Sequence, residues 1–245
     1  MRGIRALIQK TAPGKLARSG KFACFRARTS SNRPTGPKLR GITKLLTKKL
    51  YSAATPPSDG SWRGGAWQGA GGGLRRGKAV DAQVSRLAKG SEAMRKRSRM
   101  LKLTRLTFNA LAYHSLVPVD AQRVVIDPER GIGTAVDVVC TRGEAELVLV
   151  ELKTGFGGDR TRDAGTFMQK PLVKAKDSHI NRHFAQLAAT LHLFNREKRT
   201  LAKLLAKGVD KVSGCVLYVD GDVSEKFELP AWWERRGERI VDRIS

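Results

Sequence analysis

The stretch from Gly133 to Lys153 reads GTAVDVVCTRGEAELVLVELK, and it decides how we expect the chain to fold. It contains two apolar runs rich in valine and leucine, which are separated by the turn residues Thr141–Arg142–Gly143. Short apolar runs on either side of a glycine-containing turn are typical of a β-hairpin. We therefore predict two neighbouring strands, Gly133–Cys140 and Glu146–Lys153.

Three charged residues interrupt these apolar runs: Asp137 in the first strand, and Glu151 and Lys153 in the second. Side chains two residues apart lie on the same face of a strand, so Glu151 and Lys153 share a face. Burying such charges without partners would be costly. Two carboxylates that converge where adjacent strands meet would offset this cost by sharing a hard cation. Mg²⁺, which prefers oxygen ligands, is the natural candidate, and Mn²⁺ is the alternative.

The same residues predict a hydrolytic chemistry. Asp137 and Glu151, together with the carbonyl of Leu152, would hold the metal ion, which would lower the pKa of a bound water and neutralise charge on a phosphate. Lys153 would orient or deprotonate that water and stabilise the transition state. A purely structural interpretation also remains open, in which Lys153 pairs with Glu151 at a sheet edge and Asp137 caps a turn.

Helices and further strands are expected on both sides of this hairpin. Apolar residues at helical spacing from Leu74 onward predict a helix, and an extended stretch at Gln122–Ile126 precedes the hairpin. This order predicts an α/β or α+β fold, with a mixed sheet flanked by helices. The remaining expected elements are helices at Arg97–His114, His179–Asn195, Lys198–Ala206 and Pro230–Ile240, and a hairpin of Gly214–Asp220 with Val223–Leu229.

In its motifs the chain resembles the PD-(D/E)XK nuclease superfamily, and within it the lambda-exonuclease/RecB-like branch. The signature D-x(n)-E-x-K of that superfamily is present as Asp137, Glu151 and Lys153. An upstream helical element with the pattern Arg-Gly-x-x-Val-acid is matched by Arg76–Asp81, and a downstream helix with a glutamine is matched by Gln186. The resemblance spans residues 72–229.

The resemblance implies a restriction-endonuclease-like mixed β-sheet core, with Gln186 as a further catalytic residue and Asp81 as a further metal ligand. Asp81 stands where many relatives carry His or Glu, and a solvated helix residue is the alternative for it. The resemblance also implies a Mg²⁺-dependent DNA exonuclease that acts in recombination, repair or genome processing. A structure-specific endonuclease of the resolvase kind is the alternative activity.

Positive charge is concentrated at the front of the chain. The formal net charge is +25, and residues 1–58 contain 14 Lys and Arg but no acidic residue. Such a distribution attracts polyanions, so a non-catalytic basic nucleic-acid-binding or packaging protein is a further possibility. We expect a disordered, flexible basic arm or targeting segment over residues 1–59, a Gly-rich linker over 60–73 and the nuclease-like domain over 74–245.

DNA, as double-stranded ends or single strands, is the expected partner. No apolar run reaches membrane-spanning length, which argues against an integral membrane protein. The composition leaves the compartment open, with the nucleus and the mitochondrion as intracellular possibilities. The candidates for DNA contacts are Arg75, Arg76 and Lys78 at the start of a helix, and Lys170, Lys174, Lys176 and Arg182 on the other side of a channel.

Overall fold

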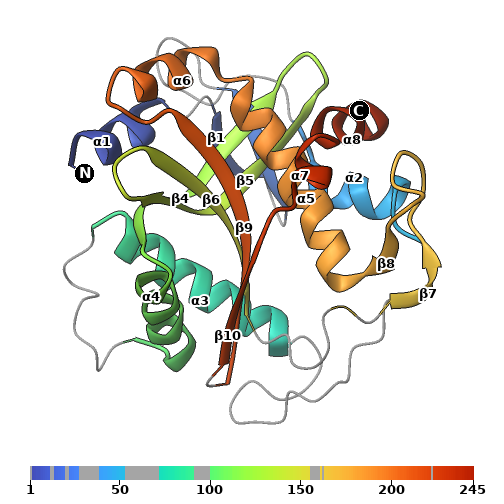
Figure 1. Ribbon diagram of the computed structural model, residues 1–245, viewed down its shortest axis with the longest axis horizontal. Coiled ribbons are helices and arrows are strands. Elements are labelled where there is room, and N and C mark those ends of the chain that lie inside the picture. The colour runs from blue at the N-terminus through green and yellow to red at the C-terminus, as the bar shows by residue number, and fades with distance from the viewer. Residues whose placement is uncertain are drawn as a thin grey trace.

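A mixed six-stranded sheet forms the centre of the molecule in the computed structural model (Figure 1). The structure describes residues 2–11, 14–19, 22–27, 39–52, 72–90, 100–154, 161, 163–221 and 223–245. The strands of the central sheet are β3 (Arg40–Gly41), β4 (Leu116–Asp127), β5 (Ile132–Arg142), β6 (Glu146–Thr154), β9 (Lys211–Asp220) and β10 (Val223–Glu228). Two further antiparallel pairs are β1 (Gly14–Ser19) with β2 (Phe22–Ala27), and β7 (Asp163–Phe167) with β8 (Lys176–Ser178).

The predicted hairpin is present as β5 and β6, which pair antiparallel from Val138 opposite Val150 to Arg142 opposite Glu146. Strand β4 pairs antiparallel with β5, and the predicted extended stretch lies inside this longer strand. Strand β9 pairs parallel with β6, and β10 follows antiparallel to β9. Because parallel neighbours need a crossover connection, the chain passes through α5 (His179–Asn195) between β6 and β9.

Helices cover both faces of the sheet, which confirms the expected mixed α/β fold (Figure 1). Helices α3 and α4 pack on one face, and α5 packs with α2, α7 and α8 on the other. The terminal helix expected at Pro230–Ile240 is in fact two helices, because the chain turns between Glu234 and Gly237. The helices other than α5 are α1 (Arg2–Thr11), α2 (Ile42–Lys49), α3 (Gly72–Ala88), α4 (Lys102–Tyr113), α6 (Lys198–Leu205), α7 (Ala231–Glu234) and α8 (Gly237–Ile244).

Strand alternation decides which helical layer each side chain of β6 faces. Leu149 belongs to the hydrophobic cluster around α5, whereas Val150 belongs to the cluster around α3 and α4. Successive side chains of a strand point to opposite faces. Glu151 and Lys153 therefore lie on the face that α5 covers.

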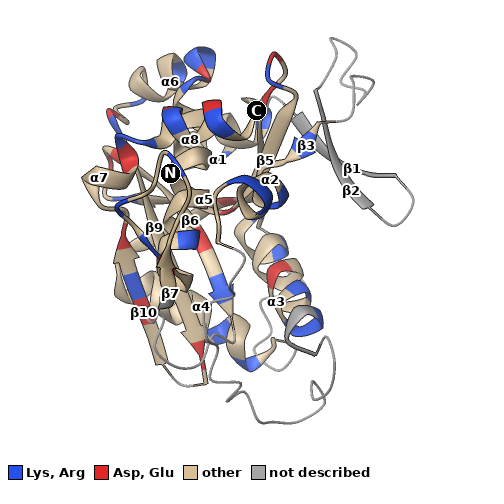
Figure 2. Ribbon diagram, turned by 90° about the vertical axis from the view of Figure 1, so that its right-hand side faces the viewer, with Lys and Arg blue, Asp and Glu red and all other residues tan. Residues whose placement is uncertain are grey.

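The expectation of a flexible arm over residues 1–59 does not hold for its two described helices, α1 and α2. Ile8, Ile42 and Leu46 are fully buried in the main hydrophobic core. The basic residues of α2, blue in Figure 2, are mostly exposed, so α2 is an amphipathic helix. The net charge of this region does not reveal the apolar side of the helix. Most of the expected Gly-rich linker lies outside the described residues, and its last two residues begin α3.

A buried arginine connects α1 to the sheet and to α6. Arg123 of β4 is 1% exposed, and its guanidinium pairs with Glu197 at 2.6 Å. The same guanidinium donates a hydrogen bond to the carbonyl of Ile8 in α1. A buried charge that loses its partner destabilises a fold strongly, so β4 depends on α1 and α6 being in place.

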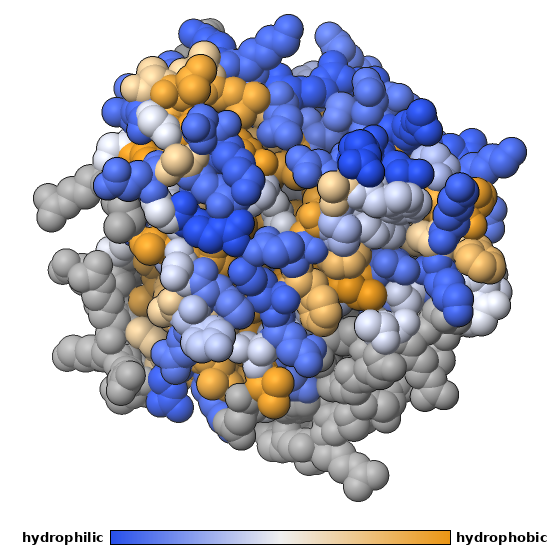
Figure 3. Space-filling model, viewed as in Figure 1, coloured by the Kyte–Doolittle hydropathy of each residue, from blue (hydrophilic) through white to orange (hydrophobic). Residues whose placement is uncertain are grey.

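The outer surface is mixed in character. On the face shown in Figure 3 it is largely hydrophilic, with a hydrophobic patch over α6, where Leu205 is 63% exposed. Among the described helices, none combines the length and the apolar character that crossing a bilayer requires.

Replacing Ile8 with Ala should lower the free energy of unfolding by about 2–5 kcal/mol, because the change leaves a cavity at a fully buried position. Urea denaturation followed by circular dichroism measures the change. Lys10→Ala, at an exposed position of the same helix, is the matched control and should be close to neutral. Equal stability of the two variants would show that α1 does not contribute to the core.

Candidate active site

Strands β5 and β6 separate at the residues that carry the predicted charges. Their pairing ends at Val138 opposite Val150, although β6 continues beside β9 as far as Thr154. Beyond this point β5 pairs instead with β3, through Ile132 and Gly133. Asp137 and Glu151 are the next residues of the two strands, so both lie where the regular ladder has ended.

The carboxylate of Asp137 binds a backbone amide of β6 just beyond the point where the β5–β6 pairing ends. Its Oδ2 accepts a hydrogen bond from the backbone amide of Leu152 at 3.0 Å, and its Oδ1 accepts one from Gln122 at 3.4 Å. Gln122 lies in β4 with a φ of 52°, in the left-handed region that residues other than glycine rarely adopt. Nothing in the local sequence pattern distinguishes Gln122 from other strand residues, so only the fold shows that it contacts Asp137.

Glu151 is the centre of a buried polar cluster. It is 3% exposed, and its Oε1 accepts hydrogen bonds from Nζ of Lys153 at 2.5 Å and from Nε2 of Gln186 at 2.7 Å. Gln186 reaches Glu151 from α5 and is 9% exposed. The structure therefore brings together the four predicted catalytic residues, with Asp137 on the neighbouring strand.

The electrostatics of this cluster indicate an excess of negative charge. Burial raises the pKa of Asp137 well above its usual value, and the charge of Glu151 raises it further, against the opposing effect of Lys153. Burial lowers the pKa of Lys153, but Glu151 and Asp137 outweigh that effect, so the pKa is raised overall. Both shifts are in the direction that a bound cation would counteract.

Asp81 on α3 lies within electrostatic range of the cluster. Burial raises its pKa to about 6, with Lys153 lowering it and Glu151 raising it. Among the described residues, however, no group of three or more His, Cys, Asp or Glu side chains is arranged to hold a metal ion. Asp81 therefore does not complete a three-residue ligand set with Asp137 and Glu151 in this structure.

The donors at the strand separation fit a Mg²⁺ ion nevertheless. Mg²⁺ is usually held by one or two carboxylates and completes its shell with water and substrate phosphate. Asp137 and Glu151 supply two carboxylates, and Leu152 supplies a carbonyl beside them. Both hydrogen bonds that Glu151 accepts from Lys153 and Gln186 fall on its Oε1, so a cation would bind its Oε2.

A histidine and a tyrosine that the sequence analysis did not assign to the site lie next to Lys153. Tyr218 in β9 is in register with Lys153, and its hydroxyl lies 2.6 Å from Nδ1 of His183. Burial lowers the pKa of His183 well below its usual value, and the charge of Lys153 lowers it further, so the ring is neutral at pH 7. His183 precedes Gln186 by three residues on α5, so the two side chains lie on the same side of the helix.

Arg182, a predicted DNA contact, has partners within the fold. Its Nε donates to Oδ1 of Asp177 at 2.6 Å, and its guanidinium lies over the ring of Tyr51, 4.7 Å from the centroid. The hydroxyl of Tyr51 in turn donates to the backbone carbonyl of Arg182 at 2.9 Å. These contacts tie α5 to β8 and to the end of α2.

The other predicted DNA contacts differ in exposure. Arg75 and Lys78 are exposed on α3, whose basic residues are blue in Figure 2. Arg76, between them, is only 3% exposed and interacts electrostatically with Asp220 at the end of β9, while burial lowers its pKa. The exposed lysines near β7 and β8 are Lys170, Lys174 and Lys176.

The chain matches no protein-family model, and a search of curated proteins gave no match.

Proposed function

We propose that the protein is a Mg²⁺-dependent nuclease that hydrolyses phosphodiester bonds in DNA. The observation that carries the proposal is the meeting of Asp137, Glu151 and Lys153 where β5 and β6 separate. Gln186 joins them from α5. Ionisable groups that shift one another's pKa, as around Asp137 and Lys153, are typical of active sites. The same residues carry the resemblance to PD-(D/E)XK nucleases.

The residues of the chain have separable roles in this proposal. A Mg²⁺ ion held by Asp137 and Glu151 would activate water and reduce the negative charge of the scissile phosphate. Lys153 has a raised pKa and therefore keeps its proton. This favours a role in which the ammonium donates hydrogen bonds to phosphate oxygens and stabilises their growing charge, rather than one as a base. Gln186 holds one oxygen of Glu151 and so orients the other.

Exonucleolytic attack on DNA ends, in recombination, repair or genome processing, is the form of activity that the resemblance implies. The net charge of +25 supports a polyanionic substrate. The exposed Arg75 and Lys78 on α3, and the exposed lysines near β7 and β8, supply candidate phosphate contacts. A structure-specific endonuclease with the same catalytic residues would differ by cutting DNA that has no ends.

A non-catalytic nucleic-acid-binding protein is the second candidate. The observation in its favour is the pair of Lys153 and Glu151, whose charges compensate each other at 2.5 Å without a metal ion. Such a protein would bind nucleic acid equally well after loss of Asp137 and would need no divalent cation.

Asp137→Asn and Lys153→Met should each slow the cleavage of end-labelled linear DNA about 100-fold or more. The first change removes a charged metal ligand, and the second removes the ammonium that stabilises the phosphate. Initial rates measured in Mg²⁺, in Mn²⁺ and in EDTA test this expectation, and EDTA should abolish cleavage by the unaltered protein.

Glu144→Gln is the matched control, because Glu144 is an exposed carboxylate in the turn that joins the same two strands. It should leave the rate unchanged. The nuclease proposal fails if the unaltered protein and Asp137→Asn leave DNA equally intact. If closed circles are cut as fast as linear DNA, the activity is endonucleolytic.

Lys78→Ala should weaken DNA binding and reduce the slope of log K against log salt concentration by about 1, because each lost phosphate contact releases roughly one counterion fewer. Fluorescence anisotropy in EDTA, over a series of KCl concentrations, measures the slope without cleavage. Lys203→Ala, at an exposed position of α6, is the control. Equal slopes for the two variants would remove α3 from the DNA-binding surface.

A further inference from the structure

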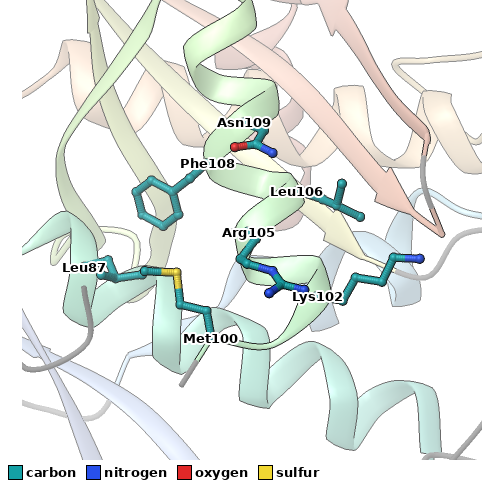
Figure 4. Close-up of a pocket in the computed structure, with 7 residues that line it drawn as sticks. All are labelled: Leu87, Met100, Lys102, Arg105, Leu106, Phe108 and Asn109. Atoms are coloured by element: carbon teal, nitrogen blue, oxygen red, sulfur yellow. The ribbon is translucent and has the colours of Figure 1, made fainter. Parts of the chain in front are cut away.

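A pocket of about 560 Å³ lies between the end of α3 and the beginning of α4 (Figure 4). Its apolar wall is formed by Leu87, Met100, Leu106 and Phe108. Pockets that bind small ligands commonly have volumes of about 300–1,000 Å³ and combine an apolar lining with a few polar groups. None of its lining residues belongs to the carboxylate cluster of the candidate active site.

The two helices that form the pocket are fixed to each other. Oε1 of Gln83 in α3 accepts a hydrogen bond from the amide of Leu101 at 2.9 Å and one from the hydroxyl of Thr104 at 2.7 Å. Leu106 and Phe108 also pack against the hydrophobic cluster beneath α3 and α4. The walls of the pocket are therefore held by tertiary contacts and do not depend on a ligand.

The rim of the pocket is polar and basic. Lys102, Arg105 and Asn109 are exposed and follow one another at three- and four-residue spacing, so they lie along one side of α4. The described residues that line the pocket include no carboxylate. The first turn of α4 adds the positive end of the helix dipole at the same place. Together these groups favour an anionic ligand with an apolar part.

We propose that this pocket binds one unpaired nucleotide of a DNA strand, with the base against Phe108 and Met100 and the phosphate at Lys102 and Arg105. Aromatic side chains stack on any base, because every base has a π-face. Basic side chains at a helix N-terminus suit a phosphate. The inference rests on the proposed function, because that function supplies DNA as the ligand.

The position of the pocket connects it to the candidate active site. Leu87 follows Asp81 by six residues on α3, which is about 9 Å along a helix axis. Arg86 is exposed between them. A DNA strand that passes along α3 from Asp81, which interacts electrostatically with Lys153 and Glu151, toward Leu87 would therefore reach the pocket. Because a base-paired nucleotide cannot turn its base into a pocket, the substrate would be single-stranded at this position.

The test is the binding of a labelled single-stranded oligonucleotide to the full-length protein in EDTA, where no cleavage occurs. Phe108→Leu, which keeps an apolar side chain, and Arg105→Ala should each weaken binding about 5- to 100-fold, the range expected for loss of one stacked base or one strong phosphate contact. Arg199→Ala, at an exposed position of α6, should leave the affinity unchanged. Wild-type affinity in both pocket variants would overturn the inference.

A series of oligonucleotides with one abasic position identifies the base. In the unaltered protein, one position should weaken binding, and Phe108→Leu should abolish that dependence. Uniform affinity along the series would overturn the assignment. Two other results would also overturn it. One is competition by the free mononucleotide dAMP that equals competition by the oligonucleotide. The other is binding of poly-glutamate that the two pocket variants weaken as much as they weaken binding of the oligonucleotide.

Failure of this inference is distinguishable from failure of the proposed function. If both pocket variants bind the oligonucleotide normally and the unaltered protein shows metal-dependent cleavage, the pocket inference fails and the nuclease proposal stands. If binding depends on the base but no cleavage occurs, the pocket inference stands and the nuclease proposal fails. The thermal unfolding temperature of Phe108→Leu is compared with that of the unaltered protein. Equal temperatures exclude unfolding as the cause of a loss of binding.

Discussion

The ion pair of Glu151 and Lys153 holds together the polar centre of the fold. The two groups are 2.5 Å apart where β5 separates from β6; Glu151 is almost fully buried, and the side chain of Lys153 is 20% exposed. Leaving one member of such a pair without its partner costs about 3–5 kcal/mol. Gln186 donates a second hydrogen bond to Glu151 from α5, and Tyr218 of β9 lies in register with Lys153. Strand β6, strand β9 and helix α5 therefore meet at this pair.

The separation of β5 from β6 gives this pair a chemical role in the proposed function. In a continuous ladder the backbone groups of both strands are paired with each other. Here the amide of Leu152 is satisfied by the carboxylate of Asp137, so a second acid is held next to Glu151 without a regular strand pairing. Burial and mutual repulsion then raise the pKa of Asp137. A bound cation would counteract this shift, and in the proposed function it would also activate water for phosphodiester hydrolysis.

The two faces of the sheet carry different kinds of residues. The carboxylates, Lys153 and Gln186 lie on the side of α5, whereas α3 and α4 on the other side carry exposed basic residues and the proposed nucleotide pocket. The basic N-terminal region is not simply a polyanion-binding tail, because α1 and α2 contribute Ile8 and Leu46 to the core. Positive charge and core formation are thus combined in the same short helices.

The sequence by itself determined the central hairpin, the bounds of α5 and the grouping of Glu151 with Lys153. These features depend on periodicity and on two-residue spacing, which are local properties of the chain. Other features were decided by tertiary structure alone, because they join residues far apart in sequence. Gln122 lies opposite Asp137, the buried Arg76 lies near Asp220, and the pocket arises between two helices. Contacts of this kind follow from how the elements pack, and no local pattern encodes them.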